Sequence, residues 1–210
     1  MSIDCFLLNA LEFPRMKKVL SKSFYNGETV EIAQALLGTC LVHESEEGLV
    51  AGRIVETEAY LCKDDPACHA SRGKTPRNAV MFGPPGHVYN YLIYGMYHCF
   101  NVVTAPEGVG EAVLIRALEP LEGMPIMERR RNTNVVKSLC SGPGKLVLAM
   151  GITPEHNGCA LTKGALTIHS RESFGGCGKF EIEVSTRIGI KVAADLPLRF
   201  SVKGSRFLSR

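Results

Sequence analysis

The chain has 210 residues, and 45% of them are hydrophobic, which is enough to bury one substantial core without requiring a second domain. Its 24 Lys and Arg residues against 21 Asp and Glu residues give a net charge of only +3, so only local clusters can argue for polyanion binding. The eight cysteines include no Cys-x-x-Cys pair, and no stretch approaches the roughly 18 apolar residues of a membrane span. These features indicate a reduced, cytoplasmic protein and argue against secretion and membrane insertion.

Hydrophobic periodicity and turn residues predict a mixed order of helices and strands in one domain over residues 1–210, with residues 1–23 loosely ordered. In chain order, we expect a helix at 28–37, strands at 39–43 and 49–60, a β-hairpin at about 87–104, a strand at 112–118, helices at 121–130 and 142–150, and short strands at 166–169, 181–186 and 198–202. The helix at 142–150 has Ser141 as its expected N-cap and Gly151 just past its end. The polar stretch 62–86 is too long for a simple connection, so we expect it to line a functional site.

Four of the six tyrosines lie in one nine-residue segment of the predicted hairpin, at positions 89, 91, 94 and 97. Aromatic rings on a hairpin can stack on nucleobases. The strand at 49–60 supplies carboxylates that could act beside a stacked base. Together, the two segments indicate an enzyme that acts on DNA.

The carboxylates Glu56 and Glu58 share one face of the predicted strand with Tyr60, because side chains of a strand alternate between its faces. Two residues apart on a strand, they would be roughly 7 Å from each other, which is within the range of an inverting glycosidase pair. A carbohydrate hydrolase is therefore a rival interpretation, although the chain has no Trp and no aromatic platform for a sugar. For Glu56 alone, we favour a structural salt bridge with Arg53 or Arg116.

Histidines and cysteines of the middle of the chain do not predict a metal site. Cys62, the pair Cys68-His69 and the pair His98-Cys99 lack the two- or four-residue ligand spacing of a zinc site. His69 lies in the polar stretch and is interpreted as a site residue, because an imidazole can stack on a base and also donate a hydrogen bond.

Basic residues form local clusters despite the small net charge. Arg72, Lys74 and Arg77 adjoin the candidate site, and we expect them, together with Lys145, to contact DNA phosphates. The triplet 129–131 closes a predicted helix and is interpreted as a solvated face.

Five strings occur in order along the chain: 53–61 (RIVETEAYL), His69 followed by 73–78 (GKTPRN), 91–97 (YLIYGMY), 114–122 (LIRALEPLE) and 139–146 (LCSGPGKL). From about residue 24 to the C-terminus, they closely resemble the alkyladenine (3-methyladenine) DNA glycosylases, and the short segment before the first helix resembles a bacterial member. The chain departs from this resemblance at Asn90, where the family usually has an apolar residue, and at His98, where an aromatic is more usual.

The resemblance implies the catalytic residues. Glu58 matches the general base that orients and deprotonates the attacking water, and Arg116 and the backbone carbonyl of Ile188 match groups that help to hold this water. No metal and no cofactor are implied. No Lys stands in a nucleophile's place in the matched strings, so simple hydrolysis without lyase activity is expected.

The resemblance also implies the residues that bind the base and the DNA. Tyr60, His69 and Tyr91 match the side chains that sandwich the flipped base, and Asn101 matches the residue that excludes normal guanine by opposing its 2-amino group. Tyr94 of the hairpin matches the side chain that is inserted through the minor groove into the gap left by the extruded nucleotide. Met96 and Tyr97 match the residues that flank it.

The implied fold is a single mixed α/β domain, with a curved, largely antiparallel sheet, surrounding helices and a protruding β-hairpin. The implied enzyme is a monofunctional glycosylase of base excision repair that removes alkylated or deaminated purines, such as 3-methyladenine, 7-methylguanine and hypoxanthine, from double-stranded DNA and leaves an abasic site. We expect a monomer that is cytoplasmic and associated with the nucleoid. Two alternatives stay open: a catalytically silent nucleic-acid binding module on the same scaffold, and a sugar hydrolase that uses Glu56 and Glu58.

Overall fold

The computed structural model describes residues 18–93 and 97–209. Its strands are β1 (Cys40–Ser45), β2 (Gly48–Tyr60), β3 (Val88–Ile93), β4 (Tyr97–Val103), β5 (Ala112–Glu122), β6 (Leu166–His169), β7 (Ile182–Ser185) and β8 (Arg199–Val202). Its helices are α1 (Thr29–Leu36), α2 (Met124–Arg131), α3 (Val136–Leu139) and α4 (Pro143–Met150), with short 3-10 helices η1 (Lys22–Tyr25), η2 (Ala79–Phe82), η3 (Pro154–His156) and η4 (Ser173–Gly175).

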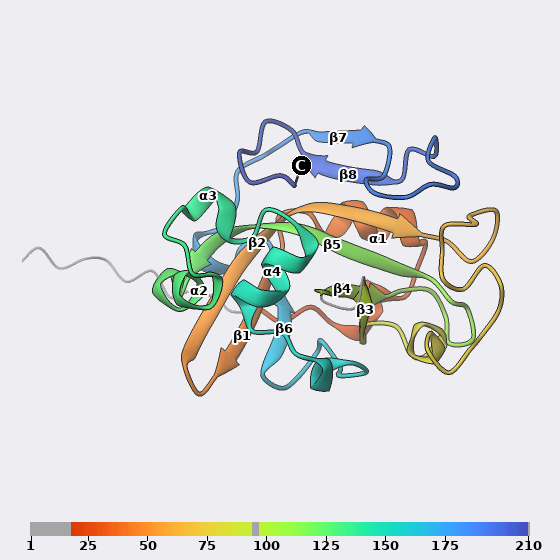
Figure 1. Ribbon diagram of the computed structural model, residues 1–210, viewed down its shortest axis with the longest axis horizontal. Coiled ribbons are helices and arrows are strands. Elements are labelled where there is room, and N and C mark those ends of the chain that lie inside the picture. The colour runs from red at the N-terminus through yellow and green to blue at the C-terminus, as the bar shows by residue number, and fades with distance from the viewer. Residues whose placement is uncertain (1–17, 94–96, 210) are drawn as a thin grey trace, which may run out of the picture.

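The strands form one curved sheet in the order β3-β4-β5-β2-β1-β6 (Figure 1). The two remaining strands extend it, because β8 pairs with the second half of β2 and β7 pairs with β8. All of these pairings are antiparallel. The structure therefore confirms the predicted class, a mixed α/β fold on a largely antiparallel sheet.

The long strand β2 is buried without interruption from Val50 to Ala59. Its two faces pack into different clusters, because Ile54 belongs to the main core while Val55 packs with Ala117 and Phe207. A strand covered on both faces reads as a nearly continuous buried run instead of alternating. Polar side chains on this strand are therefore buried as well, and each requires a partner.

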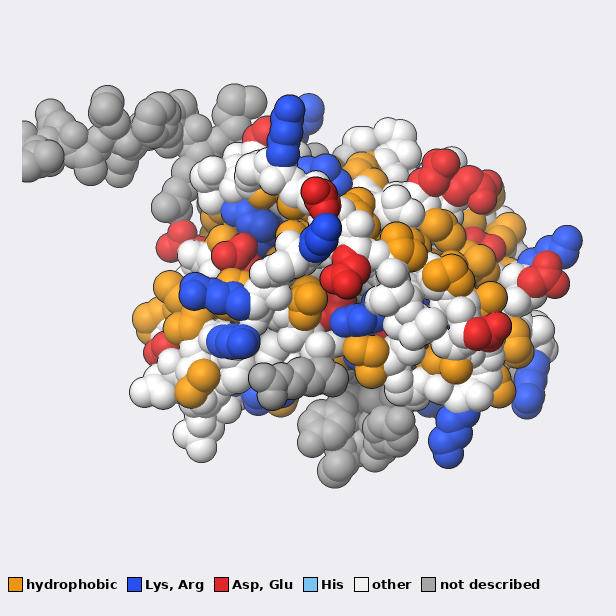
Figure 2. All heavy atoms as spheres, turned by 90° about the horizontal axis from the view of Figure 1, so that it is seen from above, with side chains coloured by type: hydrophobic (Ala, Val, Ile, Leu, Met, Phe, Trp, Pro, Cys, Tyr) orange, Lys and Arg blue, Asp and Glu red, His pale blue; other side chains and the backbone are white. Residues whose placement is uncertain are grey.

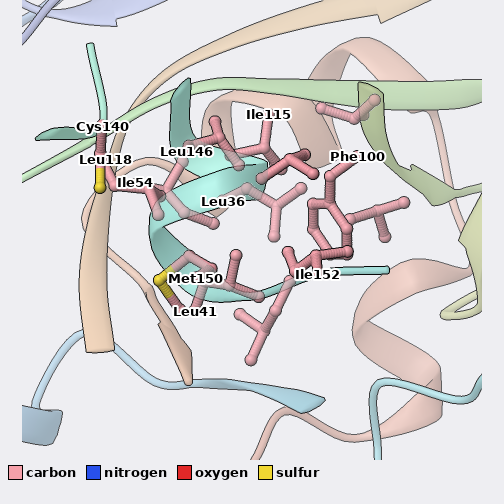
Figure 3. Close-up of a cluster of buried hydrophobic side chains, with 14 of the residues drawn as sticks. Leu36, Leu41, Ile54, Phe100, Ile115, Leu118, Cys140, Leu146, Met150 and Ile152 are labelled. Carbon is pink, nitrogen blue, oxygen red and sulfur yellow. The ribbon is translucent and has the colours of Figure 1, made fainter. Parts of the chain in front are cut away.

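The main core lies between the sheet and the helices α1 and α4. Figure 3 shows Leu146 of α4 beside Ile115 of β5, with Leu36 of α1 and Phe100 of β4 nearby. All four side chains have no exposed area. This packing fixes β5 and β2 against the helices and so fixes the strands that carry the candidate site residues.

Two predicted helix starts are wrong. Residues 121 and 122 belong to β5, whose last residue, Glu122, pairs with Ala51 of β2, so the sheet ladder overrides the expected helix start at Leu121. Gly123 then adopts a left-handed backbone with φ of 70° and begins α2. At α4 the cap position is held by Gly142 without a side-chain hydrogen bond, because Ser141 forms a β-bridge with Ala117.

The other predicted elements are found with small shifts of their ends. The helix expected at 28–37 is α1, and the expected hairpin is the antiparallel pair β3 and β4. The one-turn helix α3 was not predicted, since no periodic pattern marks it. Among the described residues, the helices are too short or too polar to span a membrane.

Replacing Gly123 with Ala should destabilise the fold for two reasons. A left-handed backbone costs a non-glycine residue about 1 to 2 kcal/mol, and the new Cβ would also collide with the backbone oxygen of Leu49, which adds about 1 to 3 kcal/mol. Gly204 is the matched control, because it has φ of 77° but open space around its Cβ position. Urea unfolding should show a larger loss for Gly123→Ala than for Gly204→Ala, and equal losses would contradict the collision.

Candidate active site

The carboxylate of Glu58 lies at the centre of the candidate site and is fully buried. Its Oε1 accepts the backbone N–H of Ile188 at 2.8 Å and pairs with Nη1 of Arg116 at 3.1 Å. Its Oε2 accepts the hydroxyl of Tyr60 at 2.9 Å. Three donors thus fix the orientation of this carboxylate and compensate for its loss of water. It is the backbone N–H of Ile188 that contacts Glu58. The resemblance instead implied that the backbone carbonyl of Ile188 helps to hold the attacking water.

Strand register places further residues beside Glu58. Tyr89 of β3 pairs with Asn101 of β4, which pairs with Leu114 of β5, which pairs with Glu58 of β2. Beyond Glu58, the row continues through Arg199 of β8 to Ser185 of β7. Directly opposed residues of an antiparallel sheet project from the same face, so the hairpin residues and the carboxylate belong to one side of the sheet.

The carboxylate of Glu56 is bound by side chains and backbone that hold the fold together. It accepts Nε of Arg199 at 2.6 Å, Nε of Arg116 at 3.3 Å, and the N–H and hydroxyl of Ser209 at 2.6 and 2.8 Å. The expected salt bridge is therefore confirmed, and of the two candidate partners it is Arg116 that forms it, since Arg53 pairs with Glu119.

The two carboxylates do not flank an open cleft. Both side chains have no exposed area, and one guanidinium, that of Arg116, binds both. A glycosidase pair needs a sugar and a water between its carboxyl groups. The arrangement therefore does not favour the sugar hydrolase.

Aromatic side chains of β3 and the 62–86 segment form a cluster. The rings of His69 and Tyr91 meet edge to face with centroids 4.5 Å apart, and Tyr89 stacks on Tyr91 at 5.2 Å. Nδ1 of His69 is 3.0 Å from the hydroxyl of Tyr89. Burial, assisted by the nearby charge of Arg77, lowers the pKa of His69 below its usual value, so the neutral imidazole is favoured near pH 7.

A cavity of about 20 Å³ lies within this cluster and is lined by Tyr60, His69, Met81, Tyr89, Tyr91 and Asn101. A space of this size holds about one water, so a purine can enter only if the rings move apart. Four of the five predicted pocket residues, Tyr60, His69, Tyr91 and Asn101, are thus brought together, whereas the fifth, Ile188, does not line this cavity and contacts Glu58 instead. Two lining residues were missed; Tyr89 could have been found from its alternation with Tyr91, whereas no pattern marked Met81.

The side chain of Asn101 is held in place within the sheet. Its Nδ2 donates to the backbone oxygens of Tyr89 and Cys99 at 3.0 and 3.1 Å, and the residue is buried. Both amide protons are therefore used by the backbone, and the side chain cannot turn away from the cavity without breaking these bonds.

The expected phosphate contacts are exposed: Arg72, Lys74, Arg77 and Lys145. Arg77 donates to the backbone oxygen of Leu92 at 3.0 Å, which ties the 62–86 segment to the hairpin. On the face seen in Figure 2, acidic and basic side chains are interspersed, without a broad area of one sign. Tyr94 and Met96 lie outside the described residues, as does the side chain of Tyr97.

The departure at Asn90 has a structural explanation. Its N–H donates to Oδ1 of Asn157 at 2.9 Å, and its Nδ2 donates to the backbone oxygen of Thr153 at 2.8 Å. The side chain therefore binds β3 to the segment around η3 and supports the base of the hairpin.

A buried ion pair next to Tyr60 was not predicted. Nη1 and Nη2 of Arg187 bind the two carboxylate oxygens of Asp65 at 2.7 and 2.6 Å, and neither side chain has exposed area. The guanidinium lies 4.7 Å from the centre of the Tyr60 ring. Asp65 also accepts the N–H groups of Leu61 and Ala67. No local sequence pattern relates these two residues, because they are 122 positions apart.

Clusters of three or more His, Cys, Asp or Glu side chains that could hold a metal ion are absent from the part of the chain that the structure describes. The candidate site consists of a buried carboxylate with its donors, next to a small aromatic cavity.

Comparisons with known proteins identify the family of the chain. The family model "Methylpurine-DNA glycosylase (MPG)" matches residues 23–206. A protein of Methanoculleus marisnigri named "Putative 3-methyladenine DNA glycosylase" is 54% identical over 91% of this chain and 98% of its own length. Relatives of the same name from Carboxydothermus hydrogenoformans and Bradyrhizobium diazoefficiens are 46% and 45% identical, over 91% and 94% of this chain and 99% and 94% of their own lengths. The chain therefore belongs to the methylpurine-DNA glycosylase family, that is, to DNA glycosylases, which are hydrolases of N-glycosyl bonds.

Proposed function

We propose that this protein is a monofunctional glycosylase of base excision repair that removes alkylated or deaminated purines from double-stranded DNA, such as 3-methyladenine, 7-methylguanine and hypoxanthine. The observation that carries the proposal is the buried carboxylate of Glu58, held by Arg116, Ile188 and Tyr60 beside an aromatic cavity. A catalytically silent binding module would have no need for such a carboxylate.

The aromatic cavity supports base flipping. The glycosidic bond of a stacked base is out of reach inside the duplex, so the nucleotide must turn out at a cost of a few kcal/mol, which is least for damaged or poorly paired bases. Stacking on an aromatic ring is worth about 1 to 3 kcal/mol per base. A base between Tyr60 on one side and His69 and Tyr91 on the other would recover this cost, and a cationic alkylated base would gain further from cation–π attraction. Tyr94, flanked by Met96 and Tyr97, would fill the gap left in the duplex.

Glu58 acts as the general base of the reaction. It takes a proton from a water whose oxygen attacks the anomeric carbon of the flipped nucleotide, while the N-glycosidic bond breaks and its electron pair leaves with the base. Arg116 and the backbone carbonyl of Ile188 help to hold this water. A cationic alkylated purine leaves without protonation, whereas hypoxanthine needs an added proton. The product is an abasic site, without strand cleavage.

Replacing Glu58 with Gln should preserve binding to lesion-containing duplex and lower the rate of base release about 10²- to 10⁴-fold, because shape is kept and the base is lost. Glu56→Gln is the matched control, since it removes the same charge from the same strand while Glu58 stays. We expect the control to lower stability more than base release. Single-turnover release of purines from methylated duplex, with gel-shift binding, measures both. Normal release by Glu58→Gln together with a loss in Glu56→Gln would mean that the wrong carboxylate was chosen, and normal release by both variants would reject the proposed chemistry.

Duplex binding should fall steeply with salt despite the small net charge, because Arg72, Lys74, Arg77 and Lys145 release counterions from the phosphates. Replacing Lys74 with Ala should reduce the slope of log affinity against log salt by about 1. Lys203→Ala is the control, since Lys203 is also exposed but pairs with Glu181. Fluorescence anisotropy over a range of salt measures the slope, and a wild-type affinity that stays constant with salt would contradict the prediction.

Replacing Asn101 with Ser should allow undamaged guanine to enter the cavity, because the discrimination is exclusion by a side chain held on two backbone oxygens. The measurement is the release of guanine from unmodified duplex, compared with the release of 7-methylguanine by the same variant. If Asn101→Ser keeps normal release of 7-methylguanine and still releases no guanine, the assigned role of Asn101 is wrong.

A further inference from the structure

The ring of Tyr60 has a cation on one of its faces. The guanidinium carbon of Arg187 lies 4.7 Å from the ring centre. Tyr60 also lines the aromatic cavity, which Arg187 does not. A base that stacks on Tyr60 must therefore use the face opposite Arg187, and the ring would separate the base from the guanidinium.

This arrangement exposes a charged base to the field of Arg187. With a stacking separation of about 3.5 to 4 Å, the base would lie about 8 Å from the guanidinium carbon. At an effective dielectric constant of about 20, a unit charge at this distance changes the affinity for a cation by a factor on the order of ten or more. Arg keeps its proton in proteins, so only a neighbouring anion can cancel this repulsion.

Asp65 supplies the anion. Its carboxylate binds both terminal nitrogens of Arg187, and both side chains are fully buried, so that solvent does not screen the pair. Two backbone N–H groups, from Leu61 and Ala67, also donate to the carboxylate and hold it in this orientation. The charge behind Tyr60 is therefore balanced.

We propose that Asp65 sets the preference between cationic and neutral damaged bases by cancelling the charge of Arg187 behind Tyr60. The inference rests on the proposed function. Neither residue touches the base. Both are specificity-determining residues that act through Tyr60, and the protein accepts alkylated purines with a positive charge because this ion pair is intact.

A structural role alone would give a different result. Arg187 also donates to the backbone oxygen of Ala59, so the ion pair joins β2 to the 61–67 segment and to the residue before Ile188. Loosening these contacts would weaken the binding of all damaged bases alike. A change of charge would instead shift the affinity for a cationic base relative to a neutral one, and the ratio of the two affinities separates the explanations.

The experiment measures binding in the Glu58→Gln protein, so that bases are not released. Duplexes that carry one 7-methylguanine, which is cationic, or one hypoxanthine, which is neutral, are each compared with undamaged duplex. Adding Asp65→Asn should lower the preference for 7-methylguanine over hypoxanthine about tenfold. Adding Arg187→Gln should raise it, and the double change Asp65→Asn with Arg187→Gln should return it to within about threefold of the parent protein.

The binding preferences of the variants can overturn the inference. An unchanged preference in Asp65→Asn, or a shift in the same direction in both single variants, would overturn the inference. Circular dichroism shows whether each variant folds. If Asp65→Asn does not fold, Arg187→Gln must still show a higher preference for 7-methylguanine than the double variant, because the two differ by the charge of residue 65 alone. If the parent protein binds neither damaged duplex more tightly than undamaged DNA, the proposed function itself has failed.

Discussion

The buried guanidinium of Arg116 is the interaction on which both the fold and the site depend. It extends from β5 to β2 and binds Glu56 and Glu58, two carboxylates that share a strand face and have no exposed area. Without a cation between them, two buried like charges would repel each other and disfavour the folded state. The partners of Glu56 then attach β8 and Ser209 to the same group, so the strand that carries the site is also held at its outer edge.

Several features of this arrangement could be predicted from the sequence because they depend on local rules. The alternation of a strand correctly placed Glu56, Glu58 and Tyr60 on one face, and the turn and tyrosine pattern predicted the hairpin. The five strings indicated the family that the comparisons confirm. The roles assigned to individual residues on this basis stay predictions.

Other features depend on the tertiary structure and leave no local pattern. The pair of Arg187 and Asp65 joins residues that neither periodicity nor spacing relates, and the late start of α2 follows from strand pairing with β2. Ser141 has the composition of an N-cap, yet its bridge with Ala117 overrides this preference. In each case, a contact distant in sequence decides between local alternatives.

The bond between Glu56 and Ser209 also constrains the order of folding. These residues are 153 positions apart, and the N–H and hydroxyl of Ser209 supply two of the donors that neutralise the carboxylate. Contacts of such separation form late, because the entropy of closing a long loop must be overcome before the contact is gained. In a nascent chain, the carboxylate of Glu56 therefore lacks these two hydrogen-bond donors until the segment after β8 has been synthesised and has docked. The candidate site is thus completed among the last steps of folding, and partly folded molecules would lack a correctly held Arg116.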